Sequence, residues 1–144
     1  MAEPKTISVV VAFVADAAKR VLLAWNDKWG GFTLPMTKPD AGPPVETDDA
    51  AALRVAAETL RVPVRLVAGR TARKTRELLL GGRDSIIKNY VYTVVPVEIH
   101  PDFAAALPAA PLWVAPRKIE EGEYGPLTDS VQPLFAEFRE WRWI

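Results

Sequence analysis

Residues 32–62 read FTLPMTKPDAGPPVETDDAAALRVAAETLRV and contain three successive structural signals. The first residues, from Phe32 to Pro35, predict a short strand, because Phe32 and Thr33 favour β-structure. The loop that follows is rich in proline, so its interior cannot be helical. Thr47 or Asp48 can then cap a helix, and strong helix formers continue from Ala50 to Leu60. The segment therefore predicts a strand, a proline-rich loop and a helix, in that order.

The charged residues of this segment follow a specific spacing. Seven residues separate Glu46 from Arg54, and Glu58 follows one turn further along the predicted helix. This spacing resembles the Nudix signature, in which a Pro-Gly-Gly-Lys turn precedes a glutamate, then seven residues, then a helix that begins Arg-Glu-x-x-Glu-Glu. Six residues stand at matching positions of that signature: Pro35, Lys38, Glu46, Arg54, Glu58 and Val62.

The same segment departs from the signature in its loop and on its helix. From Thr37 to Glu46 the loop is three residues longer than in the family. Without the two glycines of the turn, the backbone also loses the close approach that lets a carbonyl join a metal site. Five positions of the signature carry other residues: Met36 and Thr37 for the two glycines, Val55 and Thr59 for two glutamates, and Arg61 for the closing glycine.

Two of these replacements fall on one face of the predicted helix, because Val55 and Thr59 are four residues apart. The resemblance implies that the glutamates at these two places bind magnesium or manganese, which require oxygen ligands. Valine has no side-chain oxygen, threonine has a neutral hydroxyl, and Glu58 is the carboxylate that remains beside this face. We therefore expect the fold of the family without its standard metal-dependent hydrolysis.

Three functions remain open at this point. The first is a binding domain for a nucleotide-derived, diphosphate-containing ligand or for a protein partner. The second is a divergent hydrolase of a nucleoside diphosphate derivative, with magnesium or manganese as cofactor and with Glu58, Glu46 and His100 as catalytic residues. The third is a structural subunit with a vestigial cleft. Chance can also supply Glu46, Arg54 and Glu58 in an unrelated α+β domain.

The composition is that of one globular domain over residues 1–144, because 49% of the residues are hydrophobic and can form a sizeable core. Eighteen basic residues balance 18 acidic residues, so we expect no extended nucleic acid as a partner. The apolar run from Ile7 to Ala15 is too short to span a bilayer, so we expect no membrane partner and a cytoplasmic location. The chain has no cysteine and a single histidine, which excludes the common zinc sites.

The rest of the chain completes an α+β pattern. Together with residues 32–62, its elements resemble the Nudix fold in their order, and this resemblance implies a Nudix-like α/β/α sandwich with a mixed, largely antiparallel sheet. In chain order these elements are a hairpin over residues 6–15 and 20–25, a strand over 64–68, a hairpin over 73–80 and 86–99, a strand over 112–114, a short turn or helix over 115–119, and an amphipathic helix near the C-terminus.

Several polar side chains have both a functional and a structural interpretation. Glu58 is a candidate metal ligand, or an exposed partner of Arg54 at the i,i+4 spacing. We predict Lys38 and Arg54 as ligand-binding residues, although a lone loop lysine is often only solvated and the arginine can serve to orient carboxylates. His100 can act as a general base near neutral pH, or it can be a solvated loop residue.

Aromatic and basic residues extend the candidate site. We predict that Trp29 stacks on a ligand base and that Arg76 binds a phosphate, since guanidinium groups match phosphate oxygens. The alternative for the basic side chains is protection of an edge strand from aggregation. Trp141, Trp143 and Ile144 indicate either a homodimer or protein partner, or docking onto the chain's own sheet. The basic residues on or near the second predicted hairpin are Arg70, Arg73, Lys74, Arg76, Arg83 and Lys88.

Overall fold

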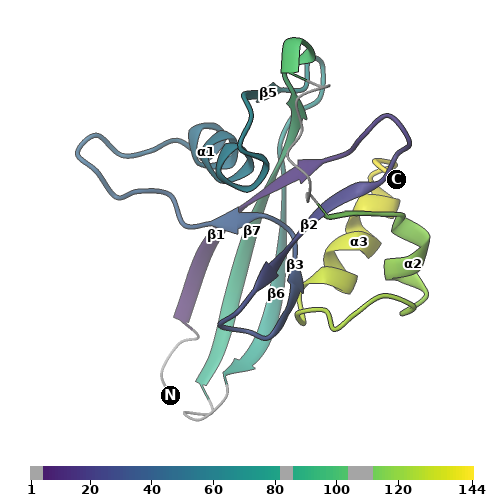
Figure 1. The fold of residues 1–144 in the computed structure, drawn as a ribbon. Helices are drawn as coiled ribbons and strands as arrows, with labels where there is room; N and C mark the ends of the chain where they lie inside the picture. Colours follow the sequence, from purple (N-terminus) through teal and green to yellow (C-terminus); the bar gives the residue numbers. More distant parts are fainter. Residues whose placement is uncertain (1–4, 82–85, 104–111) are drawn as a thin grey trace.

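The computed structural model describes residues 5–81, 86–103 and 112–144, which form two sheets with helices packed around them (Figure 1). Within these residues, no helix combines the length and the apolar character that crossing a membrane requires. The first elements are β1 (Lys5–Val14), β2 (Val21–Asn26), β3 (Gly31–Thr33), β4 (Met36–Thr37) and α1 (Asp48–Leu60). They are followed by β5 (Val64–Leu66), β6 (Arg73–Gly81), β7 (Ile86–Ile99), the 3-10 turn η1 (Pro101–Phe103), β8 (Leu112–Val114), α2 (Pro116–Glu120) and α3 (Val131–Glu140).

The larger sheet is mixed. Its strand order is β4–β1–β7–β5, and β6 also pairs with β7. β1 runs parallel to β7 along its whole length, whereas β4, β5 and β6 are antiparallel to the strands that they pair with. The smaller sheet, β3–β2–β8, is antiparallel. This arrangement confirms the predicted α+β class with a mixed, largely antiparallel sheet.

Helices cover both faces of the larger sheet, and β1 lies between two apolar cores. Val10 and Ala12 belong to the core beneath α1, whereas Val11 and Phe13 belong to the core beneath α3. Alternate residues of a strand face opposite sides, so a strand covered on both faces reads as a continuous apolar run. Figure 1 shows α1 on one side of the sheet and α3 on the other, as expected for an α/β/α sandwich.

Helix α1 begins and ends with specific capping contacts. Thr47 is its N-cap, and the Thr47 hydroxyl accepts a hydrogen bond of 3.1 Å from the amide of Ala50. At the other end, Arg61 adopts a left-handed conformation with φ of 58°, and its amide donates to the carbonyl of Ala57 at 2.7 Å. Arg61 stands where the signature has glycine, so the helix ends in the conformation that glycine adopts without strain.

The first predicted hairpin forms only at its turn. The amide of Asp16 donates to the carbonyl of Arg20 at 2.9 Å, and one isolated bridge joins Ala15 to Val21. Beyond this turn β1 pairs with β7 and β4, while β2 enters the smaller sheet. The prediction of a paired hairpin is therefore wrong, because the apolar pattern of a strand does not specify which strand becomes its neighbour.

One strand was not expected from the sequence. Met36 and Thr37, which we expected in the loop, form β4 opposite Val11 and Val10 of β1. Two residues carry no strand periodicity of their own, so their extended conformation depends on pairing with β1. This pairing carries the chain across the sheet to the start of the proline-rich loop.

The second predicted hairpin is confirmed by its pairing. β6 and β7 are antiparallel from Arg73 opposite Val94 to Gly81 opposite Ile86. Its turn, and with it Arg83, lies outside the described residues.

The C-terminal aromatic residues dock onto the chain's own larger sheet. Trp141, Trp143 and Ile144 pack against the core beneath α3, and the ring centroid of Trp143 lies 5.3 Å from that of Phe13. The guanidinium of Arg70 lies 5.7 Å from the centroid of the Trp143 ring, within the range of a cation–π contact. Of the two expectations for these residues, docking is the arrangement that the structure contains.

Candidate functional site

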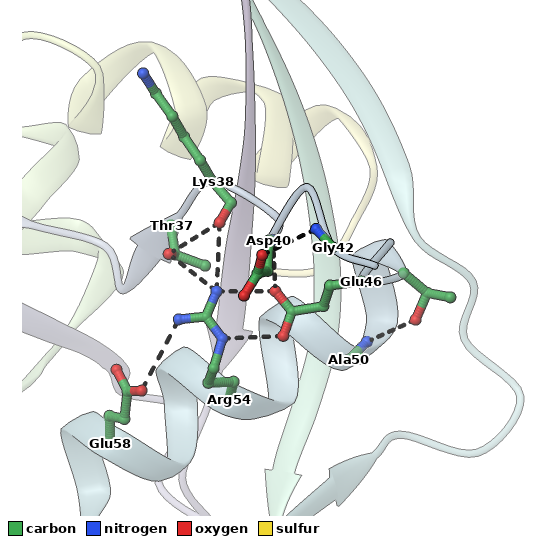
Figure 2. A network of polar contacts seen from close by, with 9 residues as sticks. Thr37, Lys38, Asp40, Gly42, Glu46, Ala50, Arg54 and Glu58 are labelled. Atoms are coloured by element: carbon green, nitrogen blue, oxygen red, sulfur yellow. Dashed lines mark hydrogen bonds and ion pairs between the residues drawn. The ribbon is translucent and has the colours of Figure 1, made fainter. Parts of the chain in front are cut away.

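Arg54 of α1 forms a bidentate ion pair with Glu46 of the preceding loop (Figure 2). Its Nε donates to Glu46 Oε2 and its Nη2 donates to Glu46 Oε1, both at 2.9 Å. Nη2 also lies 3.4 Å from Thr37 Oγ1 and 3.3 Å from the carbonyl oxygen of Lys38. One guanidinium therefore connects the helix to both ends of the proline-rich loop.

The loop itself is closed by backbone and side-chain contacts of Asp40. The amide of Asp40 donates to Glu46 Oε1 at 3.0 Å, and the amide of Glu46 donates to the Asp40 carbonyl at 2.9 Å. Asp40 Oδ1 accepts a further hydrogen bond of 3.0 Å from the amide of Gly42. We name the residues Thr37, Lys38, Asp40, Glu46 and Arg54 the loop network.

The loop network lowers the pKa of the Glu46 carboxyl group. The side chain of Arg54 and, to a smaller extent, the amide of Asp40 donate to Glu46 and lower its pKa from 4.5 to about 2. The same ion pair raises the pKa of Arg54 above its ordinary value. A carboxylate with so low a pKa is a poor proton acceptor near neutral pH, so the geometry favours a positioning role for Glu46.

The helix positions that the resemblance assigns to metal ligands are occupied by groups with other contacts. Val55 is 9% exposed and belongs to the core beneath α1. The Thr59 hydroxyl donates to the carbonyl oxygen of Val55 at 2.8 Å, within the helix. Glu58 is 65% exposed, and its Oε1 lies 3.8 Å from Arg54 Nη1. Glu58 is therefore the one carboxylate on this part of the helix, and it points toward the arginine and solvent (Figure 2).

These residues do not fit a magnesium or manganese site. Such cations take several oxygen ligands at once, preferentially carboxylates. Both carboxylate oxygens of Glu46 accept hydrogen bonds in the loop network, and the Thr59 hydroxyl donates to the helix backbone. The side chain of Val55 has no oxygen. Within the described ranges, no three acidic or histidine side chains come close enough to hold a metal ion.

Comparisons with known proteins agree with the fold. The structure is similar to that of a MutT protein from Methanosarcina mazei Go1, with a TM-score of 0.65, 16% identity and 99% of each chain covered. It is also similar to that of a Nudix hydrolase from Nitrosomonas europaea, with a TM-score of 0.62, 12% identity and coverage of 96% of this chain and 90% of the other. A third similar structure is the Ap4A hydrolase of C. elegans, with a TM-score of 0.57, 16% identity and coverage of 96% of this chain and 98% of the other. The chain has the Nudix fold. No protein-family model matches the sequence, and no curated protein matches it either.

His100 lies near the C-terminal end of α1 in this Nudix fold. Its amide donates to the carbonyl of Pro63, which follows α1, and its Nδ1 accepts a 3.3 Å hydrogen bond from the amide of Asp102. Its ring also contacts Phe103 edge to face at 5.8 Å. Glu46 precedes the opposite end of α1, a helix of 13 residues or about 20 Å. The structure therefore separates His100 from Glu46.

Trp29 and Arg76 also lie outside the loop network. Trp29 is 52% exposed in the turn between β2 and β3, where its amide donates to Asn26 Oδ1 at 3.0 Å. Arg76 is exposed on β6, opposite Val91. Of the candidate residues named from the sequence, the Nudix fold brings together Lys38, Glu46, Arg54 and Glu58 but places His100, Trp29 and Arg76 elsewhere.

Sequence reasoning missed two members of the loop network. Thr37 was considered only as a replaced glycine, yet its hydroxyl lies near Arg54 because β4 holds it beside Val10. Asp40 was not predicted as a site residue, although its amide and carbonyl both contact Glu46. The Asp-x-Gly sequence at residues 40–42 was the available signal, since aspartate and glycine favour this kind of tight loop.

Proposed function

We propose that this Nudix-fold domain binds a nucleotide-derived ligand with a diphosphate group and does not carry out standard metal-dependent hydrolysis. Two structural neighbours support the ligand class by their names. One is the Ap4A hydrolase of C. elegans, and another is a UDP-X diphosphatase (TM-score 0.50, 14% identity, covering 69% of this chain and 45% of the other). Both names refer to phosphorylated nucleotides.

The observation that carries the proposal is the state of α1. A catalytic helix of this kind needs carboxylates that converge on a cation, because the cation supplies the charge that stabilises the reacting phosphates. In this chain Val55 is part of the core, Thr59 is bonded to the helix backbone, and Glu46 is held by Arg54. The loop and helix are well connected, yet the side chains that would bind the cation are absent.

The test is thermal unfolding of the full chain with a panel of nucleoside diphosphates, nucleotide sugars and dinucleoside polyphosphates, each with EDTA and with magnesium or manganese. We expect ligands to raise the melting temperature in EDTA, because a ligand at about 100 times its Kd stabilises by about 2.7 kcal/mol. We expect no added effect of the cations and no phosphate product.

Hydrolysis would contradict the proposal. The decisive result would be a cation-dependent release of monophosphate that Glu58→Gln abolishes and Glu123→Gln does not. Glu123 suits the control because it is exposed and lies beyond α2, away from the loop network. If no ligand raises the melting temperature, the ligand part of the proposal fails and a protein partner becomes the better explanation.

A further inference from the structure

A row of side chains crosses the larger sheet beside α1. The strand register places Thr37 of β4 opposite Val10 of β1, Val10 opposite Thr93 of β7, and Thr93 opposite Lys74 of β6. Residues directly opposite one another in neighbouring strands share a face of the sheet. These four residues, which lie far apart in the sequence, therefore form one line across four strands.

The face on which this row lies is the one covered by α1. Val10 belongs to the core beneath α1, and the Thr37 hydroxyl lies 3.4 Å from Arg54 Nη2 of that helix. Thr93 and Lys74 follow on the same face by register. Figure 1 shows the lower ends of β1, β6 and β7 extending beyond α1. On this face of β1, Val10 is buried whereas Ser8 is exposed, so the row lies where the covered part of the sheet ends.

The β6 end of the row carries positive charge. Lys74 is exposed, and so is Arg76, two residues further along the same strand. Neither side chain has an ion-pair partner among the residues that the structure describes. On the opposite face of β6, by contrast, the guanidinium of Arg73 lies 5.7 Å from the ring centroid of Trp141. Thr93, which stands directly opposite Lys74 in the strand register, is only 8% exposed.

Hydroxyl and cationic groups at one place are the donors that bind phosphate oxygens. The distance along the row from Thr37 to Lys74 corresponds to three strand spacings, or about 14 Å. Lys38, whose side chain is exposed, adjoins the far end. A diphosphate is shorter than this row, and Val10 in the middle of the row is buried, so one diphosphate can contact the cations at the β6 end but not those at both ends.

From these observations we infer that Lys74, Thr93 and Arg76 bind a phosphate group of the ligand without a metal ion, supplying charge that divalent cations provide in the family. This inference rests on the proposed function and assigns the phosphate-binding residues. It contrasts with edge protection, in which the same basic residues only prevent pairing of β6 with another chain.

The experiment is calorimetric titration of the full chain with inorganic pyrophosphate in EDTA, comparing wild type, Lys74→Gln and Lys88→Gln. Lys88 is the matched control because it lies on the same sheet but on the other face. It stands opposite Leu79 and Lys5, and it precedes Asn89, which shares the face of Thr93. We expect Lys74→Gln to weaken binding by about tenfold, the factor that equals about 1.4 kcal/mol. Lys88→Gln should leave the Kd within a factor of about two.

The outcomes separate this inference from the proposed function. Equal loss in both variants, or no binding of pyrophosphate to wild type under any condition, overturns the inference and leaves the absence of hydrolysis untouched. Binding that appears only with magnesium contradicts the proposed function itself. Unchanged affinity in Lys74→Gln together with new self-association, measured by sedimentation velocity, would show that edge protection is the role of this lysine.

Discussion

Arg54 and Val55 are neighbours on α1, yet they lie in opposite environments. The guanidinium of Arg54 joins the loop network through Glu46, whereas Val55 is buried against the sheet. The Nudix signature has a charged residue at both positions, and this chain retains only the first. In this chain the contacts that anchor the loop are present, whereas a buried valine stands at the next position, where the signature has a glutamate.

The largest effect should come from placing a charge at Val55. Val55→Glu is expected to lower the free energy of unfolding by about 2–3 kcal/mol, because a carboxylate then replaces an apolar side chain in the core beneath α1. Urea denaturation would measure the change. Ala50→Glu is the matched control, since Ala50 is exposed on the same helix, and it should change stability by less than about 0.5 kcal/mol. Equal stability of the two variants would show that position 55 is open to solvent.

Restoring both carboxylates tests whether α1 has the alignment that we assign to it. The double variant Val55→Glu/Thr59→Glu should gain a rise of a few degrees in melting temperature on addition of magnesium or manganese, because cation binding stabilises the folded state. Wild type should show no such rise. Val55→Gln/Thr59→Gln has nearly the same shape without charge and should not respond to either cation. A double glutamate variant that ignores both cations would contradict the alignment.

A smaller effect is expected at the ion pair of Arg54. Arg54→Gln should raise the pKa of Glu46 from about 2 toward 4.5, as followed by carbon-13 NMR of its carboxyl group. A carboxyl whose pKa is lower in the folded state stabilises above its unfolded pKa, and this contribution is lost as the pH falls. For Glu46 the loss should occur between pH 4.5 and about 2. Arg65→Gln, which removes the exposed pair with Glu98, should leave the Glu46 titration unchanged.

The smallest expected effect concerns the end of α1. Arg61→Gly should raise the free energy of unfolding by about 0.5–1 kcal/mol, because glycine adopts the left-handed conformation of residue 61 without steric cost. Arg61→Ala keeps the Cβ atom and should bring no comparable gain. Urea denaturation of both variants would measure the difference. A gain in the alanine variant alone would indicate that the arginine side chain, and not the backbone conformation, is the source of strain.

Sequence patterns predicted the individual elements better than their neighbours. The α1 cap at Thr47 and the apolar run of β1 are local features, and the structure contains both. The pairing of β1 with β2 was wrong, and β4 was missed, because strand partners are chosen by packing across the whole sheet. The docking of Trp141 and Trp143 was likewise one of two open interpretations until the core beneath α3 was known.

The residues of the candidate site also differ in how far the sequence predicted their positions. The spacing of Glu46, Arg54 and Glu58 was visible in the sequence because one helix and one loop set their separation, and the structure brings these residues together. His100 and Trp29 were also plausible by residue type, but the fold places them on other loops. Residue type indicates what a side chain can do, whereas its position depends on contacts that are distant in sequence.

By itself, the sequence determined that α1 forms, where it begins and which of its positions lack carboxylates, because capping, helix propensity and i,i+4 spacing are local properties. The sequence also predicted a strand over residues 6–15, which contains most of β1. Only the tertiary structure decided that Thr37, Thr93 and Lys74 lie in one row, since parallel and antiparallel pairing of four strands sets that register. Strand register depends on the burial of complete sheet faces, which no single segment encodes.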